Sequence, residues 1–250
     1  MQQKFHSILF STPMVQAILD GRKTMTRRVV ENRYSALDKE WKPTIVKEEH
    51  FDGIDRWEWR NGTRYLLPTF KCPYGKPGDT LWVKESYYSY GFWTKNGQTK
   101  TGKQKWSFID DAAYTSIAYN DRPPYQVEKN SNREVGWYKR LGRFMPKKAC
   151  RLFLRIKSVR VERLQEISES DAKSEGASPT AYGKYKPGFE IIWQSINGAD
   201  SWDANPWVWV ITFERIEKPE LFLTSNTNQN GRKKSTRKTQ LVGVPTQTGR

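Results

Sequence analysis

A short basic run near the N-terminus contains two residues suited to acyl chemistry. Lys23 and Thr26 stand three residues apart in the segment "ILDGRKTMTRR". A threonine hydroxyl becomes an effective nucleophile only when a neighbouring base removes its proton. A lysine amine acts as that base where burial or nearby positive charge lowers its pKa, and Arg22, Arg27 and Arg28 supply such charge. The same cations also suit a phosphate-binding surface, so the run alone fits two functions.

The whole chain carries an excess of positive charge. Its 250 residues include 43 Lys and Arg against 27 Asp and Glu, which gives a formal net charge of +16. Residues 226–250 hold six of the positive charges and no acidic residue, so subtracting them leaves +10 for the rest. Each phosphate contact releases counterions, and aromatic residues, 14% of the chain, can stack on bases. We expect RNA, single-stranded DNA or a modified nucleoside as the partner.

Several other classes of protein are disfavoured. Cys72 and Cys150 lie far apart, and His6 and His50 are the only histidines, so no zinc-ligand spacing is present. We therefore predict no metal and no cofactor. The N-terminus lacks the apolar segment of a signal peptide, and no stretch approaches 18 apolar residues. The sequence favours a cytoplasmic location and no membrane partner.

Regular elements are expected on both sides of two irregular stretches. Pro13 near the start and Gly21 after the end predict a helix capped by Thr12. Residues 150–164 alternate as a strand that slips phase at Lys157 and Ser158. Further helices are expected after Ser168 and over residues 186–197, with further strands over 81–84 and 207–216, Asp79 in a turn, and Trp82, Trp193, Trp207 and Trp209 in the core.

The domain organisation follows from this order of elements. It predicts an α+β fold, a small β-barrel with flanking helices, in one domain over residues 5–218. Residues 31–70 and 86–146 show no sustained period and are predicted to be loop insertions. Residues 224–250 are polar and basic, and are predicted to form a disordered tail.

Four segments together resemble the ASCH domain, a member of the PUA-like superfamily of β-barrels. They are "ILDGRKTMTRR", "PGDTLWVKE", "VERLQEISESDAKSEG" and "WVWVITFERI". The wider pattern is similar to the long ASCH-type proteins of bacteriophages and prophages. The resemblance covers residues 7–217 outside the two insertions, and it implies a PUA-like barrel and a role on nucleic acids or nucleosides.

The resemblance also implies roles for three residues. Small bacterial ASCH proteins are amidohydrolases that remove the acetyl group from N4-acetylcytidine, using a Lys, a Thr three residues later and a Glu in the helix after the third strand. Matching the motifs places these roles on Lys23 as base, Thr26 as nucleophile and Glu175 as acid. The size of this chain and its two insertions depart from the small members, which leaves the substrate open.

Two non-catalytic alternatives fit the same residues. In the first, the basic run binds phosphates, Glu175 forms an ordinary ion pair with Lys23, and the protein is a phage-type module that binds RNA or modified DNA. In the second, it is an accessory protein that binds a host protein. A pocket that gathers Lys23, Thr26 and Glu175 favours the enzyme. Contacts with substrate or nucleic acid are expected from Arg22, Arg27, Arg28, Glu85, Tyr87 and Tyr88.

The charge distribution predicts salt-dependent binding. The protein should bind RNA or single-stranded DNA, and the affinity should fall markedly as salt rises, because counterion release drives the association. Removal of residues 226–250 should weaken binding without abolishing it, since the remaining residues keep most of the positive charge. Binding titrations at several salt concentrations measure both effects. No association even at low salt would contradict a nucleic-acid partner.

Overall fold

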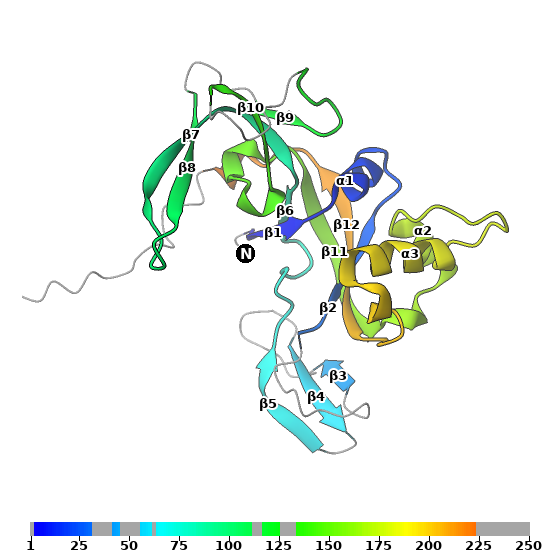
Figure 1. The fold of residues 1–250 in the computed structure, drawn as a ribbon. Coiled ribbons are helices and arrows are strands. Elements are labelled where there is room, and N and C mark those ends of the chain that lie inside the picture. Colours follow the sequence, from blue (N-terminus) through cyan, green and yellow to red (C-terminus); the bar gives the residue numbers. More distant parts are fainter. Residues whose placement is uncertain are drawn as a thin grey trace, which may run out of the picture. The chain divides into compact units, whose positions relative to one another are not determined.

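The computed structural model describes residues 3–31, 42–45, 56–61, 64–111, 117–125 and 134–223. These residues form an α+β structure made mostly of strands (Figure 1). The chain divides into two compact units, Met1–Pro219 and Glu220–Arg250. In the second unit the described part holds the 3-10 helix η5 (Glu220–Phe222). The predicted tail at 224–250 lies outside the described residues.

A five-stranded sheet is the centre of the first unit. Its strand order is β1-β6-β11-β12-β2, with β1 parallel to β6 and the other neighbours antiparallel. The outer strands β1 and β2 are joined through helix α1 and do not pair with each other, so over the described residues this sheet is open where a closed barrel was expected. Its strands are β1 (Phe5–Leu9), β2 (Met25–Val29), β6 (Thr80–Lys84), β11 (Phe153–Arg163) and β12 (Trp207–Ile216).

The two stretches predicted as loop insertions contain sheets of their own. One sheet has the order β3-β4-β5, and the other has the order β10-β7-β8 with β9 paired to β7. The register shifts within β4–β5 and within β7–β8, which interrupts the alternation that would have revealed these strands. The strands are β3 (Lys42–Ile45), β4 (Trp57–Asn61), β5 (Arg64–Phe70), β7 (Tyr87–Gln98), β8 (Gln104–Asp110), β9 (Ile117–Tyr119) and β10 (Gly136–Arg140).

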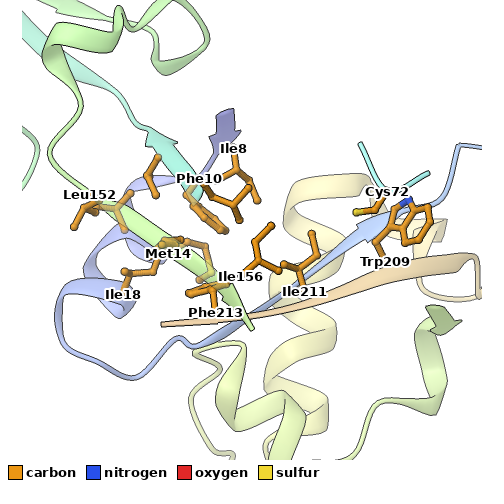
Figure 2. Close-up of a cluster of buried hydrophobic side chains, with 14 of the residues drawn as sticks. Ile8, Phe10, Met14, Ile18, Cys72, Leu152, Ile156, Trp209, Ile211 and Phe213 are labelled. Atoms are coloured by element: carbon orange, nitrogen blue, oxygen red, sulfur yellow. The ribbon is translucent and has the colours of Figure 1, made fainter. Parts of the chain in front are cut away.

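Strand β12 is covered on both faces, as its unbroken apolar sequence predicts. Trp209, Ile211 and Phe213 belong to a cluster that includes side chains of α1 (Figure 2). Val208 and Val210 alternate with them and belong to a second cluster, formed with α2 and α3. Strand β12 therefore belongs to both hydrophobic cores. Each of its buried side chains stabilises the fold by about 1.5–3 kcal/mol.

The helices begin and end close to the predicted residues. Helix α1 (Thr12–Leu19) has Ser11 at its N-cap position, where Thr12 was expected. The Thr12 hydroxyl instead accepts a hydrogen bond of 2.8 Å from Asn120. Gly21 follows the helix with a φ of +74°, in the left-handed region that favours glycine.

The second half of the fold also follows the sequence pattern. The Ser168 hydroxyl accepts a hydrogen bond of 3.1 Å from the Asp171 N–H and so caps helix α2 (Glu169–Ser174). Helix α3 (Lys186–Asn197) ends before Gly198. The β11–β12 register shifts between Ile156 and Ser158, which confirms the predicted bulge.

Asp79 lies in a turn, as predicted, and three of the four tryptophans predicted for the core are buried. The Asp79 carboxylate accepts hydrogen bonds from the backbone N–H groups of Lys76 and Lys4, at 3.1 and 3.3 Å, and so stabilises a turn. Of the four tryptophans predicted for the core, Trp82, Trp193 and Trp209 are buried. Trp207 is only half-buried, and the Arg163 guanidinium lies 4.4 Å from its ring.

Gly176 allows the end of α2 to approach the segment after α1. Its φ is +84°, and a Cβ atom there would lie 3.0 Å from Ala17 Cβ and 3.2 Å from Lys23 Cβ. A side chain at this position would therefore suffer both backbone strain and overlap with its neighbours.

Replacement of this glycine should lower stability more than replacement of an unhindered one. Gly176→Ala should lower the free energy of unfolding by about 1–2 kcal/mol for the left-handed backbone, plus about 1–3 kcal/mol for overpacking. Gly183→Ala is the matched control, because Gly183 has a φ of +74° and nothing within 4 Å of its Cβ position. Urea denaturation measures both variants, and equal losses would contradict the close approach.

Candidate functional site

Backbone contacts bring Lys23 and Glu175 together from distant parts of the chain. The Lys23 N–H donates to Ala17 O at 2.9 Å, which ties the residue to α1. The Thr24 N–H donates to Ser174 O at 2.8 Å, and Lys23 and Glu175 form an antiparallel bridge. The segment between α1 and β2 is thus fixed to the last turn of α2.

The side chains of these two residues form a buried ion pair. Lys23 Nζ donates to Glu175 Oε2 at 2.6 Å and to the Glu175 carbonyl at 2.8 Å. Each residue is only 3% exposed. Burial lowers the pKa of Lys23 below its ordinary value, although the Glu175 carboxylate opposes this shift. The amine therefore releases its proton more readily than an exposed lysine does.

Thr26 shares a pocket with this pair. It is buried in β2, where it pairs with Ile211 of β12. Lys23, Thr26 and Glu175 all line a pocket of about 690 Å³ between the end of β1, β2 and helix α3. Most other wall residues are apolar, among them Leu9, Phe10, Met14, Val29, Phe189, Ile192, Trp193 and Ile196.

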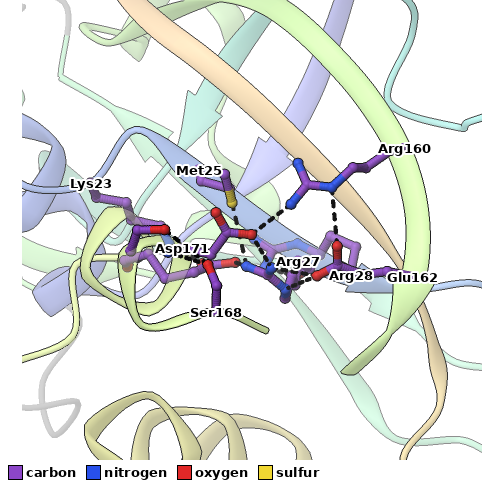
Figure 3. A network of polar contacts seen from close by, with 10 residues as sticks. Lys23, Met25, Arg27, Arg28, Arg160, Glu162, Ser168 and Asp171 are labelled. Carbon is purple, nitrogen blue, oxygen red and sulfur yellow. Dashed lines mark hydrogen bonds and ion pairs between the residues drawn. The ribbon is translucent and has the colours of Figure 1, made fainter. Parts of the chain in front are cut away.

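Arg27 is buried beside the pair and is surrounded by carboxylates (Figure 3). Its guanidinium contacts Glu162 at 2.5 Å, Asp171 at 2.8 Å and Glu175 at 3.2 Å. Burial alone would lower the pKa of Arg27, but the carboxylates, Glu175 foremost, raise it above its ordinary value. Because all three carboxylates are engaged with its donors, Arg27 acts as a structural cation here.

Arg160 completes a network in which the charges balance. It contacts Asp171 at 2.6 Å and Glu162 at 3.0 Å. With Lys23 and Arg27 it supplies three positive charges against the three carboxylates of Glu162, Asp171 and Glu175. A buried charge is tolerated only when it is paired, and this balance allows Lys23 to lie beside an apolar pocket.

The other expected contact residues lie in different surroundings. Arg28 lines the pocket. Arg22 pairs with Asp20 at 3.0 Å and is not among the described residues on the pocket wall. Both Glu85 oxygens accept hydrogen bonds of 2.9 Å from Arg151, so this carboxylate is used within the fold.

The expected stacking residues are buried. Tyr87 is 6% exposed and Tyr88 is 8% exposed, so neither offers a free ring face to a base. Tyr87 packs with Met145 and Ala149 in a small core under the β10-β7-β8 sheet. Aromatic residues in strands pack well against neighbours, which accounts for their place here.

Several residues of the site were not expected from the sequence. Arg160 and Glu162 stand two apart in β11 and therefore share one face of the strand. Two opposite charges on one face of a strand are a signal that could have marked the network in advance. The apolar wall from α3 gives no such signal, since its residues read as ordinary core positions.

Comparison of the chain with protein-family models, with curated proteins and with solved structures finds no match. Within the described ranges, no helix combines the length and the apolar character needed to cross a membrane. In the same part of the chain, no group of three or more His, Cys, Asp and Glu residues is arranged to hold a metal ion.

The ion pair should appear as energetic coupling in a double-mutant cycle. Glu175→Gln should cost about 3 kcal/mol or more, because it leaves the buried Lys23 cation without its carboxylate. Lys23→Met should cost less, since Glu175 keeps its contact with Arg27 at 3.2 Å. The double variant should cost about 1–3 kcal/mol less than the sum of the two. Urea denaturation of the four proteins gives the coupling, and additive losses would contradict a direct pair.

The same proteins should reveal the lowered pKa of Lys23. Between that lowered pKa and the ordinary value of 10.5, the folded chain binds fewer protons at this site than the unfolded chain does. The free energy of unfolding should therefore rise with pH across this window. Lys23→Met is the reference, because methionine does not titrate. If the difference in free energy of unfolding between the wild type and Lys23→Met does not change with pH in this window, the lowered pKa of Lys23 is contradicted.

Proposed function

We propose that the protein is a metal-independent amidohydrolase of N4-acylated cytidine, related to the PUA-like ASCH proteins. The observation that supports this proposal is the Lys23–Glu175 pair, with Nζ and Oε2 2.6 Å apart, on the wall of a pocket that Thr26 also lines. These are the three residue types that the chemistry requires.

The pair can supply a base and an acid at once. When the shared proton lies on Lys23, the two groups form an ion pair. When it lies on Glu175, they are a free amine and a carboxylic acid. Burial lowers the pKa of Lys23 and so favours its neutral amine, the form that can act as a base. The Glu175 carboxylate also contacts Arg27 at 3.2 Å.

The reaction then proceeds in two stages. The Lys23 amine accepts the proton of the Thr26 hydroxyl, and the oxygen attacks the amide carbonyl of the substrate. Glu175 donates a proton to the N4 nitrogen as the carbon–nitrogen bond breaks, which releases cytidine and leaves an ester on Thr26. In the second stage the ionised Glu175 removes a proton from water, and the resulting hydroxide attacks the ester carbonyl. Lys23 returns its proton to the Thr26 oxygen as the ester bond breaks, so the acyl group leaves as a carboxylic acid and both groups regain their starting protonation.

The pocket suits a pyrimidine in size and in chemistry. Its volume of about 690 Å³ lies within the range of small-molecule sites. The rings of Phe10, Phe189 and Trp193 are among its walls, and aromatic walls pack well against a flat heterocycle. The polar residues Lys23, Thr26 and Glu175 lie at the edge of this apolar space, where an exocyclic amide can meet them.

Incubation with N4-acetylcytidine tests the proposal. The wild type should release cytidine, and Lys23→Ala, Thr26→Ala and Glu175→Gln should each reduce turnover by about 10² or more, as expected for groups that transfer protons or attack. Thr26→Val should do the same while filling the same volume, so this variant separates lost chemistry from lost packing. Chromatography of the products measures cytidine.

The matched control is Thr24→Ala. The backbone N–H and carbonyl of Thr24 bond to Ser174 and Phe213, and the residue is exposed and outside the pocket wall as described, so this variant should keep nearly full turnover. Each protein is assayed at a temperature where thermal denaturation shows that it is folded. Turnover that survives all three substitutions contradicts the proposed roles. Tight binding of the nucleoside without turnover in the wild type would instead favour the non-catalytic binding module.

A further inference from the structure

The pocket opens to solvent through a mouth with exposed apolar side chains. Leu9 and Leu141 are 50% and 54% exposed, and Val29 and Ile196 are 43% and 56% exposed. All four line the pocket. Side chains that are half exposed and still line a cavity mark its opening, so the mouth lies between the end of β1, the end of β2, helix α3 and the turn before the 3-10 helix η1 (Gly142–Phe144).

Three cations come from the elements that form this mouth. Arg28 and Arg143 line the pocket. One terminal nitrogen of Arg28 donates to Leu9 O at 2.8 Å. Lys84 pairs with Leu9 in the β1–β6 register, and its Nζ donates to Arg143 O at 2.8 Å.

These mouth cations differ from Lys23 and Arg27 in their partners. Among the described residues, no carboxylate forms an ion pair with Arg28, Lys84 or Arg143. Arg28 donates to Leu9 O at 2.8 Å and to Arg27 O at 3.1 Å, and its side chain also bonds to that of Tyr74. The Arg28 guanidinium lies 5.0 Å from the Phe10 ring, and that of Arg143 lies 4.9 Å from the Phe144 ring. The cations of the inner network are thus each paired with a carboxylate, whereas these three cations, over the described residues, have no carboxylate in direct contact.

Arg143 is held at the mouth by close packing. A Cβ atom on the preceding Gly142 would lie 2.8 Å from Leu9 Cδ1 and 2.7 Å from the carbonyl carbon of Glu85. The glycine thus lets η1 lie directly against the ends of β1 and β6. Arg143 itself is exposed, so its guanidinium stays available to a ligand.

We infer that Arg143 and Arg28, supported by Lys84, form a phosphate subsite, and that the substrate is a cytidine nucleotide. This inference rests on the proposed function, because it takes the inner pocket as the place of the base. Guanidinium groups bind phosphate oxygens through paired hydrogen bonds. The phosphate of a nucleotide extends outward from the sugar, and here it meets the unpaired cations at the mouth. The phosphate can belong to a free nucleotide or to a residue within a polynucleotide.

Calorimetric titration with unreactive ligands tests the subsite independently of catalysis. The wild type should bind cytidine 5′-monophosphate at least about tenfold more tightly than cytidine, a typical gain for a charge-assisted phosphate contact. Arg143→Ala should remove most of this preference while changing the affinity for cytidine less than about threefold. Arg155→Ala is the matched control, since Arg155 is an exposed β11 arginine beside Glu214 at 3.9 Å and outside the pocket wall.

A short cytidine oligonucleotide distinguishes the two sources of phosphate. Tighter binding of the oligonucleotide than of the monophosphate, lost in Arg143→Ala, indicates a polynucleotide substrate. Equal or weaker binding indicates a free nucleotide. Thermal denaturation confirms that Arg143→Ala is folded, as expected for an exposed side chain. A wild type with no preference for the phosphate, or a preference that Arg143→Ala retains, overturns the subsite.

The turnover assay keeps the two proposals separate. It compares N4-acetylcytidine with its 5′-monophosphate, and Arg143→Ala should lower kcat/KM for the phosphate alone by about tenfold or more. If both substrates are turned over without a preference for the phosphate, the proposed subsite is refuted and the proposed amidohydrolase activity stands. If titration shows a preference for the phosphate but no turnover is detected, the proposed amidohydrolase activity is refuted, and the pocket is a nucleotide-binding site with this subsite.

Discussion

The burial of Arg27 is the constraint on which the arrangement of the site depends. A guanidinium cannot leave water without carboxylates to replace its hydration, and these come from three places in the chain. Glu162 lies on β11, Asp171 lies in α2, and Glu175 lies directly after α2. Their attraction to one cation fixes the short helix α2 against the edge strand β2, and the same contacts place Glu175 beside Lys23.

The charges are divided between an interior that is neutral and a mouth that is not. Inside, the network pairs each of its three cations with carboxylates, and Lys23 lies beside an apolar pocket. A hydrogen bond between two such groups is stronger than it would be in water, because the surroundings have a low dielectric constant. At the mouth, positive charge remains available to attract an anion from solution. Part of the chain's net positive charge therefore lies where it can attract an anionic ligand to the pocket.

The elements with local signals could be predicted from the sequence. Pro13 and Gly21 bound α1, Ser168 caps α2, and the phase slip at Ser158 is the bulge of β11. Strands β4, β5, β7 and β8 were missed because register shifts break their alternation, and β3, β9 and β10, of three to five residues, are too short to show a period. The open edge of the central sheet also depends on tertiary packing, which no local pattern records.

Some residues of the site could likewise be predicted from the sequence, and others could not. Lys23, Thr26 and Glu175 were grouped through the family resemblance and not through any local pattern, and they line one pocket. The partner of Glu85 is Arg151, which lies 66 positions away and shares no motif with it. The close packing at Gly176 also indicates how related proteins could be recognised. Because Ala17 and Lys23 leave no room there for a side chain, a protein with the same Lys–Glu arrangement is expected to carry glycine at the position of Gly176, and this glycine offers a sequence test of kinship that the basic run does not.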